Sequence, residues 1–522
     1  MNRAEMLDRL RSERAEWDIL VIGGGATGVA CALDAASRGY RTALVEQHDF
    51  GKGTSSRSTK LIHGGVRYLE QGNVTLVMEA LKERGLLREN APHLVKDLAF
   101  IVPNYEWWEA PFYGVGLRIY DLLAGKYGFG KSRILSREET LERLPNLKPE
   151  GLRGGVEYYD GQFDDARLLV QMARTAAEQG AALVNYAKVV ALRLDAHGLA
   201  AGAVVRDEEA GGEFEIRARA VINATGCFSD AVRRMGDAEA RPMIAPSQGV
   251  HLVFDSSFLR GQAAILAPRT RDGRVMFAIP WHGHALVGTT DTPLSEISLE
   301  PLPMEEEIEL ILETAADYLD RAPSRADILS AWAGIRPLVK SVEGASTASL
   351  ARDHSIHIDR NGLITIAGGK WTTCRRMAED CIDQASILAG LEERECVTRR
   401  LRIHGYHHHA EQFGPLSVYG SDAIAIREMM RLHPERARPL APPLPYTEAE
   451  AVWAARWEMA LHVEDVLERR TRALQLNARA AMEAAPRVAQ ILAAELGRDA
   501  AWQAAETERF LGLARRYLPA GV

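Results

Sequence analysis

A glycine-rich turn near the N-terminus constrains the fold of this chain more than any other feature. The segment Gly23-Gly24-Gly25-Ala26-Thr27-Gly28 fits the pattern G-x-G-x-x-G. An apolar run, 18–22, precedes it, and apolar residues at helical spacing follow it. In this strand–turn–helix context the glycines let the backbone approach a pyrophosphate, and the helix N-terminus offers unpaired N–H groups. We therefore expect Gly23, Gly25, Ala26, Thr27 and Gly28 to bind a dinucleotide.

The second strand of this unit, 42–45, ends at Glu46. A carboxylate there accepts hydrogen bonds from a ribose diol and repels a 2′-phosphate, which disfavours NADP. The turn alone does not separate FAD from NAD. Two later strand-to-turn segments favour the longer FAD: one ends in Ala224-Thr225-Gly226, and the other runs into Gly369 and Lys370, with Thr372 and Thr373 opening a helix.

Strand and helix patterns alternate along most of the chain. Helical periodicity occurs at 165–179 and 304–320, and again over 447–517 after the proline-rich segment 439–445. Strand patterns occur at 183–193, 201–205, 214–223, 249–254, 274–279, 285–290 and 363–367. This mixture predicts an α/β protein with an N-terminal Rossmann-like FAD-binding domain, an antiparallel-sheet substrate domain and a C-terminal helical domain.

We predict two main regions, an oxidoreductase region at 1–400 and the helical domain at 401–522. Within the first region the cofactor-binding parts alternate with parts of the substrate domain. The cofactor-binding parts are expected at about 15–100, 160–245 and 335–390, and the substrate parts at about 100–160 and 245–335.

Composition excludes several classes of protein. The net charge of -8 argues against a nucleic-acid partner. The sequence has no apolar run of 18 residues and no apolar core in its charged N-terminal stretch, so we predict neither a spanning helix nor a secretory signal. Five scattered cysteines without a CxxC pair predict neither disulfides nor zinc, and the run 407–409 of three histidines is interpreted as linker. We expect no metal site.

Together the motifs resemble the aerobic, FAD-dependent glycerol-3-phosphate dehydrogenases. The resemblance covers nearly the whole chain, and its most specific part is TSSRSTKLIHGGVRYLE, since related amine oxidases lack the HGGVRYLE ending. The other matching stretches are 22–39, 91–95, 158–169, 222–226, 279–281, 287–291, 334–338, 351–358, 368–380, 419–423 and 464–473. One departure is Trp371, where the family pattern has a smaller aliphatic residue.

The resemblance implies oxidation of sn-glycerol 3-phosphate to dihydroxyacetone phosphate by hydride transfer to non-covalent FAD. It implies electron transfer to a membrane quinone, and a cytoplasmic protein held peripherally at the inner face of the cell membrane. A homodimer is compatible with it.

The resemblance also implies roles for individual residues. His251 is expected to accept the alcohol proton, although it could instead be a structural strand histidine, and Arg336 is expected to hold the substrate oxygen. A phosphate dianion is bound by cations, and arginine suits it because one guanidinium binds two of its oxygens at once. The expected substrate contacts are Arg67, Tyr68, Thr289, Thr290, Arg352 and Lys370. The further cofactor contacts are Thr54, Ser55, Ser56, His63 and Gly64, with turn capping as the alternative for His63.

The segment 105–133 is rich in both aromatic and basic residues, a mixture typical of a headgroup interface. Its aromatic residues are Trp107, Trp108, Phe112, Tyr113, Tyr120, Tyr127 and Phe129. We expect a peripheral membrane contact here, and a core helix with one wet edge is the alternative.

Three rival functions remain open at this point. An oxidase of the same fold would pass electrons to oxygen. An amine or amino-acid oxidase would need one carboxylate clamp in place of several cations. A non-catalytic FAD-binding or tRNA-modifying protein would have lost some of the expected cations, or would carry a basic surface.

Overall fold

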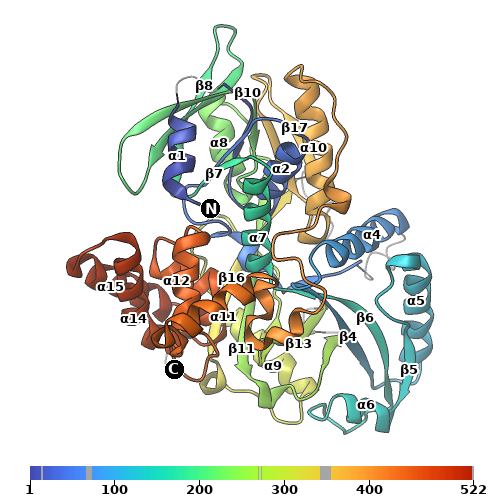
Figure 1. Ribbon diagram of the computed structural model, residues 1–522. Helices are drawn as coiled ribbons and strands as arrows, with labels where there is room; N and C mark the ends of the chain where they lie inside the picture. The colour runs from blue at the N-terminus through green and yellow to red at the C-terminus, as the bar shows by residue number, and fades with distance from the viewer. Residues whose placement is uncertain (13–15, 66–72, 269, 272, 341–353, 520–522) are drawn as a thin grey trace.

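The computed structural model describes residues 1–522 except 13–15, 66–72, 269, 272, 341–353 and 520–522. Figure 1 shows three parts: an upper α/β part, a lower part built on a second sheet, and a group of C-terminal helices beside the lower part. The chain passes between the upper and lower parts several times.

The upper part contains a sheet whose central strands are parallel. β1 pairs with β2 and β10, β2 with β7, and β10 with β18, all in parallel. The carboxyl ends of β1, β10 and β18 therefore lie at one edge, where α/β sheets bind ligands. The strands in spatial order are β17 (His354–Ile358), β18 (Ile364–Gly368), β10 (Glu213–Asn223), β1 (Glu16–Ile22), β2 (Thr42–Val45) and β7 (Ala182–Val184), with β8 (Ala187–Leu194) and β9 (Ala200–Asp207) joined through β10.

Helices pack on this sheet. Helix α2 contacts both α7 and α10, and its buried face consists of small residues that allow close approach. The helices of this part are α1 (Arg3–Arg11), α2 (Ala26–Ser37), α4 (Val74–Asn90), α7 (Asp165–Glu178), α8 (Ser229–Gly236) and α10 (Cys374–Leu388).

The lower part contains a mostly antiparallel sheet that carries substrate-side residues. Its longest pairings join β11 to β16 and β4 to β6. The strands in spatial order are β15 (Thr292–Pro293), β11 (Ile244–Asp255), β14 (His284–Gly288), β13 (Met276–Trp281), β12 (Ala263–Ala267), β4 (Val95–Asn104), β6 (Gly154–Phe163) and β3 (Leu61–Ile62), with β16 (Ser330–Val339) on β11 and β5 (Arg133–Ser136) on β6. Its helices are α5 (Glu109–Ala124), α6 (Arg137–Arg143) and α9 (Glu305–Tyr318).

The C-terminal part is helical and shares a hydrophobic core with the lower sheet. It lies against both other parts, at the left of Figure 1 in orange and red. Its main helices are α11 (Asp422–Leu432), α12 (Glu448–Trp457), α13 (Ala473–Leu476), α14 (Ala478–Leu496) and α15 (Ala500–Arg515), with a π-helical turn at Asp465–Arg470.

The predicted fold class is confirmed: an α/β part carrying the glycine turn, an antiparallel sheet and a helical C-terminal part are all present. One detail differs, because the strand expected at 183–193 is two strands. The chain turns at Tyr186, whose φ of 53° interrupts extended backbone. The domain boundaries remain predictions.

Candidate functional site

A cavity of about 1830 Å³ lies between the two sheets. Segments that are hundreds of residues apart line it, including the glycine turn, the loop after β2, the ends of β10 and β18, and strands β11 and β16. Pockets for drug-sized ligands are about 300–1,000 Å³. This cavity is large enough for a dinucleotide together with a second, smaller molecule.

The glycine turn has the geometry of a pyrophosphate cradle. Gly23 has a φ of 108°, and a Cβ on Gly28 would lie 1.9 Å from the carbonyl oxygen of Gly23, so both positions require glycine. Helix α2 begins at Ala26, and its N-cap Gly25 has no side chain to cap the first N–H groups. The Ala26 N–H donates to Ser55, and the other N–H groups of the first turn and the positive end of the helix dipole face a site suited to a phosphate.

Glu46 lies at the cavity wall where the strand pattern predicts it. Its Oε2 accepts a hydrogen bond from Gly24 N at 2.6 Å, and its Oε1 accepts one from His48 N at 2.9 Å. Burial raises the pKa of Glu46, although these two bonds oppose the shift. Each oxygen keeps a lone pair, so the carboxylate retains acceptor capacity for a ribose diol.

Most of the other expected cofactor residues also line the cavity. Ser55 binds the glycine turn, because its Oγ accepts a hydrogen bond from Ala26 N at 2.9 Å. The other expected residues found in the lining are Gly23, Gly25, Ala26, Thr27, Thr54, His63, Ala224, Thr225, Gly226, Gly369, Lys370 and Thr372. The residues thus fit a dinucleotide that extends from the glycine turn to the end of β18.

Four expected cofactor residues lie behind the lining. Gly28 is inside α2, and Ser56 is fully buried. The backbone N–H of Gly64 donates to the hydroxyl of Tyr120 at 2.8 Å, and the Thr373 hydroxyl donates to the Lys370 carbonyl at 3.3 Å. These four residues shape the wall.

His251 is on β11 and is only 2% exposed, although it belongs to the cavity wall. Its Nε2 lies 3.0 Å from Oγ1 of Thr59, and its ring stacks on Trp332 with centroids 4.3 Å apart. Burial lowers the pKa of His251 well below its usual range, and the positive charges of Lys60 and Arg336 lower it further. The imidazole is therefore neutral, which is the form that accepts a proton.

Arg336 projects from β16 into the cavity beside Thr289. Its guanidinium donates to Oγ1 of Thr289 at 3.2 Å and to the Thr290 carbonyl at 3.0 Å, and it lies 3.4 Å from Asp291. The Thr289 hydroxyl donates to the Thr290 carbonyl in a long bond of 3.3 Å, whereas the buried Thr290 hydroxyl donates to Glu307 at 2.8 Å. Thr289 is therefore the better placed of the two threonines to offer a hydroxyl to a ligand.

Among the lining residues to which sequence reasoning gave no role are Thr59, Arg274 and Asp291. Arg274 and Arg336 approach the same Asp291 carboxylate, at 3.6 and 3.4 Å. Thr59 and Asp291 belong to motifs that the resemblance identified, so the motif matches carried a signal although the individual roles did not. Arg67, Tyr68 and Arg352 lie outside the described residues.

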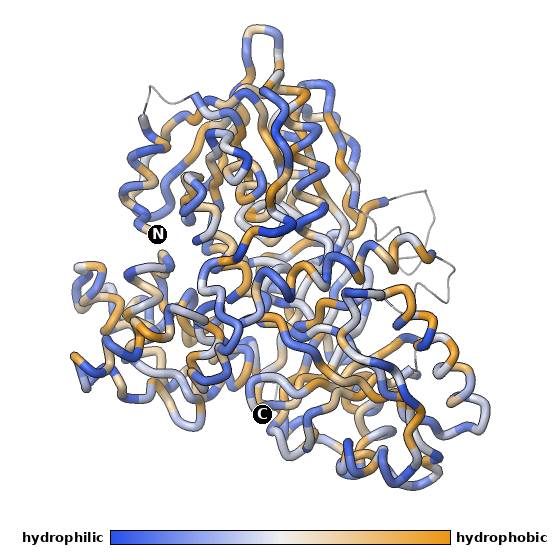
Figure 2. The backbone as a smooth tube through the Cα atoms, turned by 45° about the vertical axis from the view of Figure 1, so that its right-hand side comes forward, coloured by the Kyte–Doolittle hydropathy of each residue, from blue (hydrophilic) through white to orange (hydrophobic). Residues whose placement is uncertain are grey.

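Helix α5 contributes part of the cavity lining. The side chains of Phe112, Val115 and Ile119 line the cavity at one end, yet they are 55%, 62% and 44% exposed. The helix lies at the outer edge of the lower part in Figure 1, and hydrophobic colour continues along this region in Figure 2. The cavity therefore opens beside an apolar surface.

The expected membrane segment needs one correction. Tyr120 and Phe129 are 1% and 8% exposed, since Tyr120 bonds to Asp160 and Phe129 packs under Arg84. These two aromatic residues are part of the core. The exposed apolar face consists of Trp107, Phe112, Val115, Ile119 and Leu122.

Two further kinds of feature are absent from the part of the chain that the structure describes. That part has no cluster of three metal-ligating side chains. Nor does any described helix have the length and apolar character needed to cross a membrane.

The comparisons with known proteins agree with one another. Residues 18–375 match the FAD-dependent oxidoreductase family, and residues 365–503 match the C-terminal domain of alpha-glycerophosphate oxidase. A probable mitochondrial glycerol-3-phosphate dehydrogenase of Caenorhabditis elegans is 43% identical, covering 97% of this chain and 74% of that protein. The mitochondrial glycerol-3-phosphate dehydrogenase of Homo sapiens is also 43% identical, covering 97% and 73%. The crystal structure of the Bacillus halodurans glycerol-3-phosphate dehydrogenase with FAD has a TM-score of 0.81 at 28% identity, covering 100% and 98%.

Proposed function

The chain belongs to the FAD-dependent oxidoreductases, and within them to the glycerol-3-phosphate dehydrogenases, and from this premise we propose its reaction and its electron acceptor. The substrate is sn-glycerol 3-phosphate, the product is dihydroxyacetone phosphate, and the acceptor is a membrane quinone. The observation that carries the proposal is one cavity, which joins a dinucleotide cradle, a neutral buried histidine and several cations.

FAD, when bound in this cavity, supplies the hydride acceptor for the secondary alcohol. The glycine turn and the N-terminus of α2 would hold its pyrophosphate, and Glu46 its ribose. The resemblance predicts that FAD is not covalently attached.

His251 takes the alcohol proton in this proposal. A general base must be unprotonated at the working pH, and its position must be fixed. Burial and the nearby cations keep the imidazole neutral, while Thr59 and Trp332 fix its orientation. A bound phosphate dianion would offset the cations and so make the imidazole a stronger base when substrate is present.

Cations around the cavity bind the substrate oxygens. Arg336 stabilises the developing negative charge on the substrate oxygen, beside Thr289. Lys370, Arg67 and Arg352 are proposed phosphate ligands. Each charge-assisted hydrogen bond contributes about 1.5–3 kcal/mol, so several of them would select the phosphate ester over glycerol.

Helix α5 supports the proposed acceptor and the proposed location. The cavity reaches this helix, whose outer face is apolar and exposed. A hydrophobic quinone in a bilayer could enter from this side. We propose that the protein contacts the inner face of the cell membrane peripherally, through this face.

The test is an anaerobic reaction with substrate and a short-chain quinone, with dihydroxyacetone phosphate as the measured product. The proposal expects one ketone formed per quinone reduced. An enzyme that is reoxidised by oxygen with release of hydrogen peroxide, but not by the quinone, would instead be an oxidase.

A further inference from the structure

The loop after β2, residues 46–57, forms much of one cavity wall. On one side it binds the glycine turn. Gly51 N donates to the Gly24 carbonyl at 3.0 Å, and Ser55 Oγ accepts from Ala26 N at 2.9 Å. The shape of this loop therefore decides whether the cofactor cradle is complete, and we refer to it as the cofactor loop.

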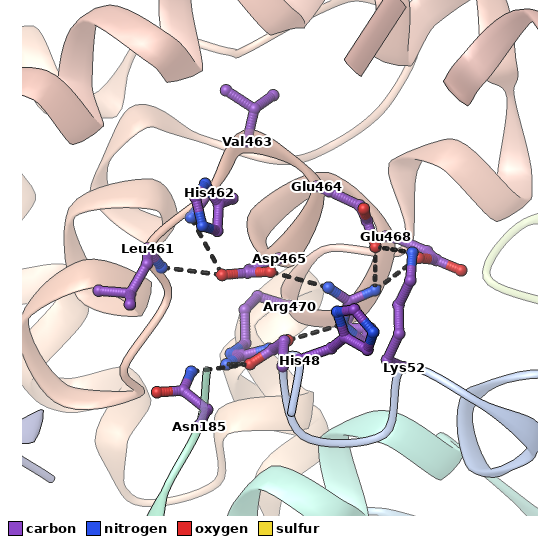
Figure 3. Close-up of polar contacts among 12 residues, drawn as sticks. His48, Lys52, Asn185, Leu461, His462, Val463, Glu464, Asp465, Glu468 and Arg470 are labelled. Carbon is purple, nitrogen blue, oxygen red and sulfur yellow. Dashed lines mark hydrogen bonds and ion pairs between the residues drawn. The ribbon is translucent and has the colours of Figure 1, made fainter. Parts of the chain in front are cut away.

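The C-terminal part holds the same loop from the other side, at the first turns after Leu461 (Figure 3). Arg469 donates to Asp49 at 2.6 Å, and Arg470 donates to both oxygens of Asp49 at 2.7 and 2.9 Å. All three side chains have zero exposure. One loop carboxylate is thus bound by two guanidinium groups of the C-terminal part, and all three groups are fully buried.

Two further ion pairs repeat this contact along the loop. Lys52 binds Glu464, as Figure 3 shows, and Arg57 binds Glu468 at 3.2 Å. Arg469 also binds Glu464 at 2.6 Å, so the pairs form one network. The loop thus presents a carboxylate to two arginines and two cations to two glutamates. A shift of the loop would place like charges together, so the contact is specific for one position of the loop.

The local structure of the C-terminal segment explains how two consecutive arginines reach one carboxylate. Residues Asp465–Arg470 form a π-helical turn, in which Thr471 N donates to the Val466 carbonyl at 2.9 Å. A π-turn has more residues per turn than an α-helix and is frequent at functional sites. Here it places neighbouring guanidinium groups on the same side.

The charges in this network depend on one another. Burial by itself would raise the pKa of Asp49, but Arg470 and Arg469 more than offset it and lower that pKa to about 2. A buried charge that loses its partner is strongly unfavourable. The loop therefore cannot leave this position without exposing or neutralising several groups at once.

We propose that the segment 464–472 is a clamp that holds the cofactor loop in the conformation that retains FAD. The C-terminal domain then has a defined part in cofactor binding, although none of its residues lines the cavity among those described. Residues Glu464, Glu468, Arg469 and Arg470 are positioning residues, since they act on FAD through the loop.

The experiment compares two carboxylate-to-amide variants of the holoenzyme. Glu464→Gln removes one charge from the clamp. Asp422→Asn is the matched control, because Asp422 also pairs across the interface, with Arg174, and is similarly buried (13% against 16% exposed) but does not touch the loop. The rate of FAD release is measured by the fluorescence of free FAD after dilution, and unfolding is followed in parallel.

The proposal expects Glu464→Gln to release FAD on the order of tenfold faster than the wild type, since a charge-assisted contact is lost. Asp422→Asn should release FAD at nearly the wild-type rate, even if it unfolds at a lower temperature. Equal release rates for the two variants, whether slow or fast, would overturn the clamp.

A variant on the loop side keeps the proposal falsifiable if Glu464→Gln does not fold. Lys52→Gln breaks the same pair from the loop and should also accelerate release. When both variants fold, their combined effect on the release rate should be smaller than the product of the single effects, because both lose the pair between Lys52 and Glu464, although Glu464 also binds Arg469 and Lys52 also binds Glu300. Fully multiplicative effects would show two independent contributions and contradict the clamp.

Discussion

The hydroxyl of Thr59 lies 3.0 Å from Nε2 of His251. The other ring nitrogen, Nδ1, is enclosed and has no hydrogen-bond partner among the described residues. A neutral imidazole carries one donor and one acceptor nitrogen, and its partner decides which is which. Thr59 is therefore the side chain that fixes which ring nitrogen of His251, the proposed base, carries the proton.

Replacing Thr59 by valine should slow flavin reduction without loss of FAD. Valine keeps the shape but removes the hydroxyl, and a hydrogen bond between neutral groups contributes about 0.5–1.5 kcal/mol, which corresponds to about two- to tenfold in rate. Thr59→Ser is the matched control, since it keeps the hydroxyl and should stay near the wild-type rate. Stopped-flow absorbance at saturating substrate measures both. If serine and valine give equal rates, the hydroxyl has no part in the reaction.

Arg336→Lys should reduce turnover far more than FAD content. Lysine keeps the positive charge but loses the planar fork that bonds Thr289 and the Thr290 carbonyl in addition to a ligand. Loss of one donor that stabilises developing charge costs about 10²–10³ in turnover. The variant should remain folded and yellow. An unchanged reduction rate would assign Arg336 a structural role.

Charges at Trp107, just before α5, and at Leu122, on the helix, should release the protein from membranes. Trp107 and Leu122 are 74% and 80% exposed and do not line the cavity. Trp107→Glu combined with Leu122→Glu should abolish sedimentation with vesicles made from phosphatidylglycerol and phosphatidylethanolamine, because acidic groups oppose insertion into an apolar, anionic surface. Reduction of the flavin by substrate should not change.

The control for that experiment is Ile424→Glu, on an apolar residue of α11 that is 61% exposed. It should leave vesicle binding intact. Vesicle binding that survives the α5 changes, or that falls equally with the α11 change, would mean that this face is not the membrane contact.

The contribution of His462 to stability should depend on pH. Burial lowers its pKa, but hydrogen bonds to Glu209 at 2.8 Å and Glu506 at 3.1 Å outweigh burial and raise the pKa to about 9. Because the pKa is raised in the folded state, the charged histidine stabilises the fold fully below the ordinary value of 6.5. This stabilisation is lost as the pH rises through 9. The shift corresponds to about 3 kcal/mol, since one pKa unit is about 1.4 kcal/mol.

Urea unfolding of wild type and His462→Gln at several pH values measures this contribution. The stability difference should be largest near pH 6 and should shrink as the pH approaches 9.5. A difference that stays constant or grows with pH would contradict the charged histidine.

Local patterns predicted those parts of the site that are local in the chain. The glycine turn and Glu46 lie within one βαβ unit, so spacing predicted their place at the cavity, whereas Ser55 in the next loop was predicted from the family resemblance. Residue type also favoured a site role for Arg336, because an arginine in an otherwise apolar strand needs polar groups or a ligand to bond with.

Contacts between distant segments could not be read from the sequence in the same way. Asp49 and Arg470 are 421 residues apart, and no periodicity links them. Composition likewise could not separate the exposed Trp107 from the buried Tyr120, since a helix has two faces and only the packing of β6 against α5 decides which is covered.

The most direct test of the account is anaerobic mixing of the holoenzyme with sn-glycerol 3-phosphate while the flavin absorbance is recorded. The cavity joins the cofactor cradle to a set of cations, so we predict rapid bleaching with the phosphate ester and slow or no bleaching with glycerol at the same concentration. Equal bleaching by the two alcohols, or no bleaching by the phosphate ester, would contradict the proposed substrate.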